Sequence, residues 1–189
     1  MYQTWEELET ACLACRKCGL CEGRSHVVVG DGNPQAKVMF IGEGPGEQED
    51  LQGKPFVGRS GQLLDKMLDA VDLDRNRDIY IANIVKCRPP KNRDPLPEEQ
   101  DMCIGWLRNQ FVLIRPKIIV CLGRIAAMKL IRPDFRITRE HGQIFEKSGV
   151  LMMATLHPAA LLRNPNQKPD AFEDFLKLRA KIDELGLQQ

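Results

Sequence analysis

Seven cysteines are the first residues of this sequence that could do chemistry, and their spacing indicates a metal site. An odd number of thiols does not suit a framework of disulfides. Cys15 and Cys18 form a CxxC clip, while Cys87 and Cys103 flank a loop that contains four prolines. Four thiolates suit either zinc or an iron–sulfur cluster.

A competing set of ligands is contiguous in the sequence. Cys12, Cys15, Cys18 and Cys21 follow one another at intervals of three residues. One short segment wraps a cubane cluster poorly, so Cys12 and Cys21 could instead be packing residues. Cys121 lies inside an apolar strand and is most simply a small buried hydrophobic residue.

A second group of residues could recognise a flat polar ligand. Gly44 lies in a glycine-rich turn where a ligand can approach the backbone and meet its N–H groups. Phe56 could stack on the ligand, and Asn83 offers a donor and an acceptor in one plane, as the edge of a nucleobase requires. His157 completes the group. Each residue also has a structural alternative: a tight turn for Gly44, core packing for Phe56, capping of a loop for Asn83 and a structural role for His157. Their occurrence together favours a functional site.

The elements that would position these residues follow from the apolar pattern. Strands rich in β-branched residues are predicted at 37–41, 79–85, 117–122 and 150–156. Helices are expected after an N-cap at Ser60, from Pro97, after Gly123, and at the C-terminal end up to Gly186. This alternation predicts one α/β domain over residues 1–189, a three-layer α/β/α sandwich around a mostly parallel four-stranded sheet.

Ligands of such sheets bind beyond the carboxyl ends of the strands. Gly44, Asn83 and His157 each follow or end a predicted strand, so we expect them to meet at one edge of the sheet. The glycine turn reads GxGxG rather than GxGxxG, and its Pro45 lacks a backbone donor, so a dinucleotide site is not favoured.

The composition excludes several classes of protein. Lys and Arg number 27 against 26 Asp and Glu, so the net charge of +1 gives no uniformly basic surface. No apolar run reaches the roughly 18 residues of a membrane span, and the acidic N-terminus has no signal-like apolar region. We therefore expect a cytoplasmic protein away from the membrane. Loop cations that could bind phosphate, or could be ordinary solvated surface, are Arg88, Lys91, Arg93, Arg124, Arg163 and Lys168.

The joint pattern of motifs resembles one known family. The motifs are CxxCxLC followed by Glu22-Gly23-Arg24, the GEGPG turn, KPFVGRSGQLLD, NIVKCRPPKNR and LHPAALLRNP, in this order between about residues 12 and 165. They resemble the family 4, iron–sulfur uracil-DNA glycosylases. The resemblance implies a single-domain α/β/α enzyme that carries a 4Fe-4S cluster and releases uracil from DNA, leaving an abasic site.

The resemblance also implies roles for individual residues. The cluster would be held by Cys15, Cys18, Cys87 and Cys103. The uracil pocket would be lined by Gly42, Glu43 and Gly44, with Phe56 stacked on the base, Asn83 bonded to its Watson–Crick edge and His157 facing O2. The partner would be uracil-containing DNA, bound by a monomer.

The mechanism follows from this substrate. Uracil in a duplex is inaccessible, so the enzyme must flip it out and fill the gap, with Leu161 as the expected wedge and Leu162 as the second choice. His157 and backbone N–H groups would stabilise the negative charge on the departing uracil. Glu43 or Glu49 would position the attacking water, and the sequence does not distinguish between them.

Two other functions use some of the same residues. A non-enzymatic nucleic-acid-binding module with a structural zinc or iron–sulfur site would need the cysteines and the basic loops, but not Phe56, Asn83 and His157 together. An electron carrier would need only the cluster. Alkali cleavage of a uracil-containing oligonucleotide after incubation with the protein would separate the three.

Overall fold

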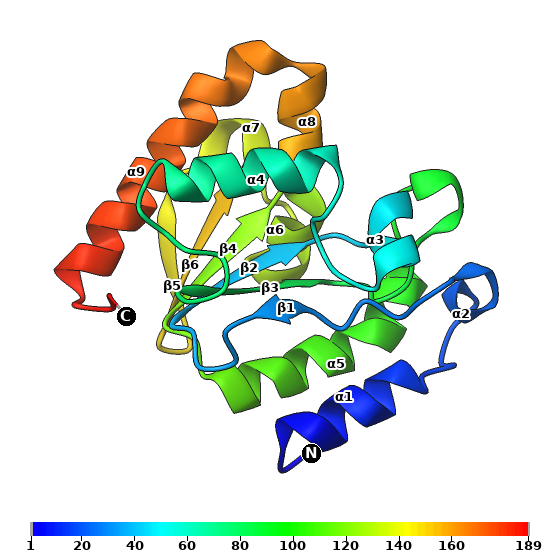
Figure 1. The fold of residues 1–189 in the computed structure, drawn as a ribbon. Coiled ribbons are helices and arrows are strands. Elements are labelled where there is room, and N and C mark those ends of the chain that lie inside the picture. Colours follow the sequence, from blue (N-terminus) through cyan, green and yellow to red (C-terminus); the bar gives the residue numbers. More distant parts are fainter. Residues whose placement is uncertain (1, 189) are drawn as a thin grey trace.

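The computed structural model describes residues 2–188 and contains one six-stranded sheet in this part of the chain, with helices on both faces (Figure 1). The strands are β1 Asp31–Gly32, β2 Val38–Gly42, β3 Ile79–Asn83, β4 Ile118–Leu122, β5 Ile144–Lys147 and β6 Val150–Thr155, in the order β1-β3-β2-β4-β6-β5. The four central strands are parallel, and β1 and β5 pair antiparallel at the two edges. The α/β sandwich and the parallel centre are confirmed, but the expected number of four strands is wrong.

Both additional strands lie where the sequence pattern is weak. β1 has two residues, too few to show an alternation. β5 is mostly exposed and joins β6 through Ser148 and Gly149, which have φ angles of 53° and 77°. Positive φ at both central residues of a tight turn favours a hairpin, because its twist matches that of the strands. The third predicted strand is correct within a residue, while the second ends earlier than expected, at Asn83.

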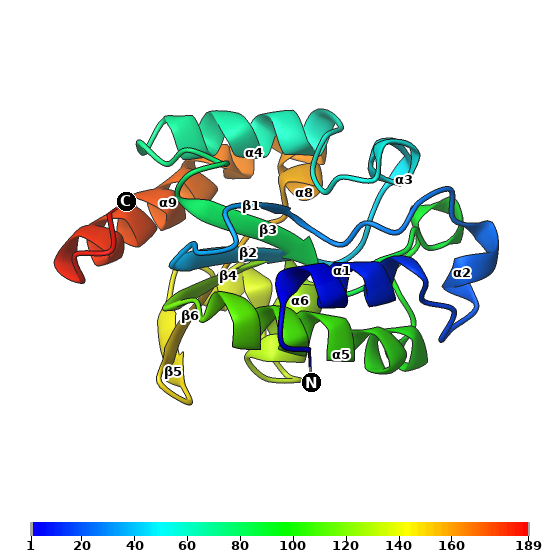
Figure 2. The same ribbon diagram turned by 60° about the horizontal axis from the view of Figure 1, so that its bottom comes forward.

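The helices form the two outer layers (Figure 2). One layer contains α4 Arg59–Asp69, α8 Pro158–Arg163 and α9 Lys168–Glu184, and the other contains α1 Trp5–Leu13, α5 Pro97–Ile114 and α6 Arg124–Leu130. The shorter helices are α2 Leu20–Gly23, α3 Glu47–Gln52 and α7 Ile137–Glu140, with 3₁₀ turns at Pro90–Asn92 and Pro165–Gln167. None of the helices described is long and apolar enough to cross a membrane.

The core is divided by the sheet because successive strand residues point to opposite faces. On the central strand β2, Val38 and Phe40 pack with α4 and α9, whereas Met39 and Ile41 pack with α1 and α5. All five β2 residues are buried. The buried central strands therefore form the base from which the loops at their carboxyl ends project.

The helix boundaries follow local chemistry with one exception. α5 begins at Pro97, and the Glu99 carboxylate accepts the Leu96 N–H at 2.8 Å, while Arg115 ends the helix with a φ of 54°. Gly123 precedes α6 as expected. The expected N-cap at Ser60 is wrong: Gly58 occupies that position, and Ser60 lies within the first turn of α4.

Candidate active site

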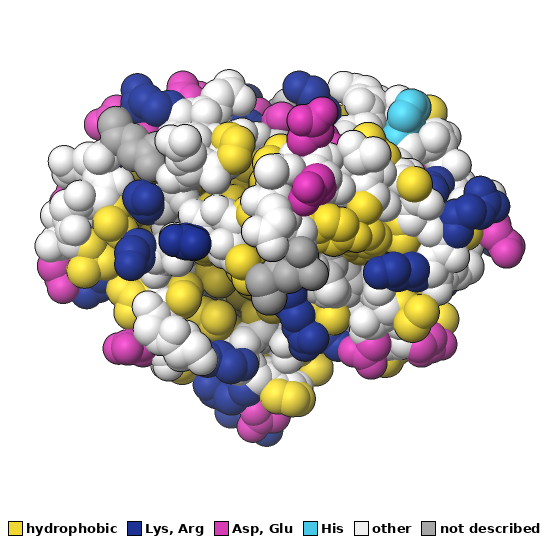
Figure 3. Space-filling view, turned by 90° about the horizontal axis from the view of Figure 1, so that it is seen from below, with side chains coloured by type: hydrophobic (Ala, Val, Ile, Leu, Met, Phe, Trp, Pro, Cys, Tyr) yellow, Lys and Arg dark blue, Asp and Glu magenta, His cyan; other side chains and the backbone are white. Residues whose placement is uncertain are grey.

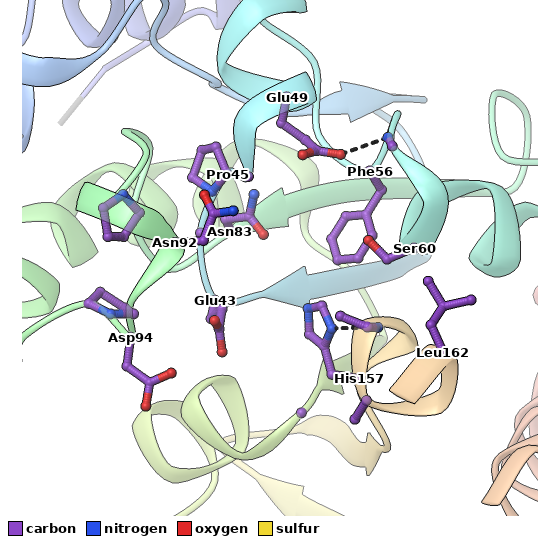
Figure 4. Close-up of a pocket in the computed structure, with 18 of the residues that line it drawn as sticks. Glu43, Pro45, Glu49, Phe56, Ser60, Asn83, Asn92, Asp94, His157 and Leu162 are labelled. Atoms are coloured by element: carbon purple, nitrogen blue, oxygen red, sulfur yellow. Dashed lines mark hydrogen bonds between the residues drawn. The ribbon is translucent and has the colours of Figure 1, made fainter. Parts of the chain in front are cut away.

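A cavity of about 700 Å³ opens at the carboxyl ends of the four parallel strands. Figure 4 shows Glu43, Phe56, Asn83 and His157 around one space, although they come from four separate segments. Gly44 and Glu49 also line this cavity. The expectation that Gly44, Asn83 and His157 meet at one edge of the sheet is therefore met by the geometry. Of the other residues implied by the resemblance, Gly42 and Leu161 do not line the cavity.

Asn83 ends β3 with its amide in the cavity. Only 1% of its surface is exposed, and its Oδ1 atom has no hydrogen-bond partner among the described residues. A buried polar atom without a partner costs roughly 1–3 kcal/mol, so such atoms are rare unless a ligand completes them. Asn83 therefore presents an acceptor that is free to bind an N–H group of a ligand.

Gly42 lies behind this amide rather than on the cavity wall. A Cβ atom at position 42 would lie 2.4 Å from Asn83 Oδ1 and 2.8 Å from the Phe56 ring. Glycine at the end of β2 is thus needed for Asn83 and Phe56 to approach each other. The expectation that Gly42 itself lines the pocket is not met, since the lining begins at Glu43.

Phe56 is held in an unusual backbone conformation. Its φ is 51°, in the left-handed region that costs a residue with a side chain about 1–2 kcal/mol. Arg75 donates from Nη1 to the Phe56 carbonyl at 2.6 Å and from Nη2 to the Pro55 carbonyl. On the other side, Gly61 packs so closely that a Cβ there would lie 1.9 Å from the Phe56 oxygen. The ring is a fixed wall of the cavity rather than a freely moving side chain.

Glu49 holds the same loop from its amide side. One carboxylate oxygen, Oε1, accepts the N–H groups of Val57 at 2.9 Å and Gly58 at 2.8 Å. The side chain is 8% exposed. Because these two bonds occupy one oxygen in positioning the loop, the geometry gives Glu49 a structural task beside the cavity.

Glu43 stands on the cavity wall itself. Burial and the neighbouring Asp94 carboxylate raise the pKa of Glu43 above its ordinary value, while Arg124 and Arg163 oppose this rise. A carboxylate with a raised pKa is a better general base near neutral pH. Of the two glutamates that the sequence left open, Glu43 lines the cavity with a carboxyl group whose pKa is raised, whereas Glu49 also holds the loop amides of Val57 and Gly58.

His157 follows β6 and serves as the N-cap of α8. Its Nδ1 accepts the Ala159 N–H at 3.1 Å, so Nδ1 carries no proton and the neutral ring must carry its proton on Nε2. Burial, with help from Arg163, lowers the pKa of His157 to about 4. The ring is thus a neutral hydrogen-bond donor at physiological pH. Its centroid lies 5.6 Å from that of Phe56, on the cavity side.

The opposite wall is the loop between β3 and α5. Pro89, Asn92 and Asp94 line the cavity from this side. Arg93 forms two hydrogen bonds to Glu99, at 2.9 and 2.7 Å, and Arg124 pairs with Asp94. The positive charges of Arg93 and Arg124, both predicted to contact phosphate, are therefore partly neutralised by carboxylates within the protein.

Leu161 does not reach the cavity mouth. It is 0% exposed and packs in the core on the α4 and α9 side of the sheet. The expectation that Leu161 inserts into DNA is wrong, because Leu161 lies on the helix α8, which turns this side chain inwards. Leu162, one residue further along the same helix, lines the cavity and is partly exposed.

The cysteines gather at a second cavity, near the N-terminal segment. It is lined by Cys15, Cys18, Cys21, Cys87 and Cys103. Three N–H groups approach three of these sulfurs at 3.3 Å: Trp106 Nε1 at Cys15, Arg24 Nη1 at Cys87, and the Lys86 amide at Cys103. N–H donors around sulfur stabilise thiolates, so the surroundings of these three thiols fit ligands of a metal group.

The thiols do not form a compact site for a single ion within the described part of the chain. Among residues 2–188, no group of three or more His, Cys, Asp and Glu side chains is close enough to hold one metal ion. In a cubane cluster each thiolate binds a different iron, so the sulfurs stand further apart than around one zinc. Burial raises the pKa of Cys12 and Cys121 to about 12, and it also raises the pKa of Cys103 to about 11, so burial alone does not separate ligands from core thiols.

Two important residues were missed by the sequence reasoning. Arg75 lies 19 residues after Phe56, in no motif, and its contact with the loop depends on the tertiary fold. Ser60, expected to cap a helix, lines the cavity beside Phe56. A motif search had no signal for Arg75, whereas the KPFVGRSGQLLD segment contains Ser60 and could have included it.

Comparisons with known proteins agree over nearly the whole chain. The family model of the uracil DNA glycosylase superfamily matches residues 29–178. A type-4 uracil-DNA glycosylase of Archaeoglobus fulgidus is 42% identical over 184 residues, covering 93% of this chain and 92% of the relative. One of Thermotoga maritima is 40% identical over 193 residues, covering 98% of this chain and 100% of the relative. A type-5 uracil-DNA glycosylase of Pyrobaculum aerophilum is 33% identical over 146 residues, covering 69% of this chain and 64% of the relative.

Proposed function

This chain belongs to the uracil-DNA glycosylase superfamily, and from that membership and its cavity we infer that it removes uracil from DNA. It is a uracil-DNA glycosylase, a hydrolase that cleaves the N-glycosidic bond and leaves an abasic site. The main observation in support of uracil binding in the cavity is the buried Asn83 amide, whose Oδ1 atom has no partner among the described residues. This amide faces the same space as Phe56 and His157.

The cavity recognises uracil through three contacts in this proposal. Asn83 Oδ1 accepts from N3–H of the base, and its Nδ2 donates to O4. Phe56 stacks on the ring, and Gly44 leaves the backbone open beside it. A Cβ at position 44 would lie 2.8 Å from Val85 Cγ2, so a larger residue would displace the turn that borders the base. The fixed orientation of the Asn83 amide supports discrimination against cytosine, whose edge has the opposite polarity.

Bond cleavage depends on charge that appears in the transition state. As the glycosidic bond breaks, positive charge develops on the sugar and negative charge on the departing uracil. His157 donates its Nε2–H to O2 and stabilises that negative charge. Glu43 positions and polarises the water that captures the sugar cation, while Glu49 keeps the Phe56 loop in place. No covalent intermediate is needed.

The base must leave the helical stack before it can enter the cavity. Leu162 is proposed to fill the gap in the duplex, because it borders the cavity and is partly exposed. Arg59 and Arg163 also border the cavity, where cations can contact the flanking phosphates. The enzyme is proposed to act as a single domain over residues 1–189, as a monomer and in the cytoplasm.

The cofactor is proposed to be a 4Fe-4S cluster bound by Cys15, Cys18, Cys87 and Cys103. Three of these sulfurs already receive N–H donors, which supports the set over the contiguous one. Cys21 lines the same cavity and Cys12 is buried in the core. The cluster would supply a covalent link between the N-terminal segment and the loop that forms one wall of the uracil cavity.

Iron analysis tests the ligands. Freshly purified protein is expected to be brown and to contain about four iron atoms per chain. A Cys87→Ala Cys103→Ala variant should lose the iron, whereas Cys121→Ala should retain it, because Cys121 lies in a strand away from the cysteine-lined cavity. Colourless protein with one zinc would contradict the cluster, and full iron in the double variant would contradict the ligand set.

Arg75 gives a further prediction, about positioning rather than contact with the substrate. An Arg75→Lys variant keeps the charge but loses the paired bonds to the Pro55 and Phe56 carbonyls. We expect the kcat/KM for uracil excision to fall about thirtyfold, since two bonds worth about 1 kcal/mol each are lost and the strained loop can relax.

The matched control is Asp65→Asn, which removes the ion pair with Arg75 but leaves the two carbonyl bonds. This variant should excise uracil at nearly the wild-type rate. Equal losses in both variants, or equal drops in their melting temperatures, would show that Arg75 acts only through general stability.

The function itself is tested with a single-uracil oligonucleotide. The protein should produce a strand that breaks at the former uracil after treatment with alkali, and a matched thymine oligonucleotide should remain intact. Binding of the uracil strand without alkali-sensitive products would instead support a non-enzymatic nucleic-acid-binding module.

A further inference from the structure

A second groove lies at the opposite end of the sheet from the uracil cavity. Its volume is about 610 Å³, and it is bordered by α5, α6 and the amino ends of β4 and β6. Figure 3 shows hydrophobic side chains in a hollow on this face of the molecule, with Lys and Arg side chains around it. None of the residues assigned to catalysis or to the cysteine-lined cavity borders this groove.

The floor of the groove is apolar. Its hydrophobic residues are Ile104, Phe111, Pro116, Ile119, Leu130, Val150 and Met152. Apart from the charged rim, Ser148 is the one lining residue with a polar side chain within the part of the chain described. A nucleobase needs several hydrogen-bonding groups for recognition, so this floor suits aliphatic and aromatic side chains better.

The rim of the groove is positive. It is formed by Arg108, Arg115, Lys117, Lys129 and Lys147, and within residues 2–188 no Asp or Glu is among the lining residues. Lys129 is paired with Asp101, and Lys147 donates to the carbonyls of Leu130 and Ile131.

The other three cations, Arg108, Arg115 and Lys117, have no carboxylate partner in the described part of the chain, and all three are exposed. Unpaired cations around an apolar floor select a ligand that is both anionic and hydrophobic.

The cations are distributed along the groove rather than gathered at one end. Arg108 and Arg115 are seven residues apart on and at the end of α5, which separates them by about 10 Å along the helix axis. Lys129 and Lys147 come from α6 and β5. A single carboxylate or phosphate head group would use one such position, whereas several acidic residues of a peptide can use all of them.

We propose that this groove binds an acidic amphipathic peptide segment of a partner protein. Leucine or phenylalanine side chains of the peptide would occupy the apolar floor, and its Asp and Glu side chains would pair with Arg108, Arg115 and Lys117. Because the groove and the uracil cavity lie at opposite ends of the strands, the enzyme could hold such a partner while it acts on DNA.

Fluorescence anisotropy tests the proposal with the iron-loaded protein. The probe is a short fluorescein-labelled peptide in which Asp and Glu alternate with Leu and Phe. Wild type should bind it saturably. Lys117→Glu should weaken binding about fivefold, because reversing one exposed charge costs about 1 kcal/mol. The matched control is Lys66→Glu, which makes the same change at an exposed lysine of α4 on the other face of the sheet and should bind like wild type.

Three outcomes would overturn the proposal. A second peptide that keeps the acidic residues but has serine in place of Leu and Phe should bind at least fivefold more weakly, and equal binding would mean charge attraction alone. Equal losses of peptide affinity in Lys66→Glu and Lys117→Glu would also mean that charge attraction alone, rather than the groove, explains the binding. If undamaged duplex DNA displaces the peptide, and Lys117→Glu weakens duplex binding as much as peptide binding, the groove is a nucleic-acid surface. Uracil excision should be unchanged in both variants, which confirms that both are folded.

Discussion

Replacing His157 by alanine is expected to lower the single-turnover rate of uracil excision by about 10²- to 10³-fold, while the affinity for DNA changes little. The reason is that, in the proposed mechanism, the Nε2–H of His157 meets a charge that exists only in the transition state. The Ala159 N–H fixes Nδ1 as the acceptor, so the ring needs no rearrangement to donate. Rapid-quench excision and filter-binding measurements on the same uracil duplex separate the two effects.

The pH profile provides a second measurement of the same residue. Because burial lowers the pKa of His157 to about 4, the wild-type rate should show no change from its protonation near pH 6.5, the ordinary value for histidine. The pKa of Glu43 is raised above the ordinary value for glutamate. The rate should therefore fall as the pH is lowered towards the pKa of Glu43, since protonation of this carboxylate removes the proposed base.

Glu43→Gln should reduce the rate and abolish this acid-side fall. If His157→Ala instead prevents DNA binding, or if the acid-side fall disappears in His157→Ala but persists in Glu43→Gln, then these roles are wrong.

An Asn83→Asp variant should excise uracil about 10- to 10²-fold more slowly and gain activity towards cytosine. A carboxylate cannot donate to O4 of uracil, but it can accept from the amino group of cytosine, and such a mismatch at a base edge is worth about 1–3 kcal/mol. The effect should be large because Asn83 is 1% exposed, so water cannot replace the lost bond. The measurement is a comparison of single-turnover rates on duplexes that differ only in uracil or cytosine.

Asn92→Asp is the matched control for this variant. Asn92 lines the opposite wall of the same cavity, so its replacement adds the same charge to the cavity without altering the base-reading amide. It should excise uracil faster than Asn83→Asp and gain no activity on cytosine. Equal losses in the two variants would show that charge in the cavity, rather than base recognition, explains the result.

The uracil cavity could be predicted from the sequence because its residues sit at the ends of strands. The apolar runs before Glu43 and His157, and the run that contains Asn83, marked three strands of one parallel sheet, β2, β6 and β3, whose carboxyl ends share one edge. The edge strand β5 was missed because it is largely exposed and lacks a continuous apolar run. Periodicity alone detects buried strands better than exposed ones.

Other features depend on side-chain direction, which the sequence pattern does not contain. Leu161 and Leu162 are adjacent and chemically equivalent, yet the helix turns one into the core and leaves the other at the cavity. The successive positions differ by about 100° around the helix, so the start of α8 decides which one faces outwards. Arg75 and Glu49 likewise gain their roles from the folding of the Phe56 loop, not from their own neighbours in sequence.

The cysteine-lined cavity lies between two parts of the chain that are synthesised at different times, the N-terminal CxxC segment and the part that contains Cys87 and Cys103. Cys103 follows Cys18 by 85 residues. At elongation rates of roughly 5–20 residues per second, about 4 to 17 s pass between the synthesis of the first pair of thiols and the last of the four. During that interval the CxxC segment has neither α5 nor the loop that carries Cys87 to shield it. In the proposed ligand set, a complete cluster site can therefore form only after Cys103 has been synthesised, and until then the N-terminal thiols need a reducing environment to stay free.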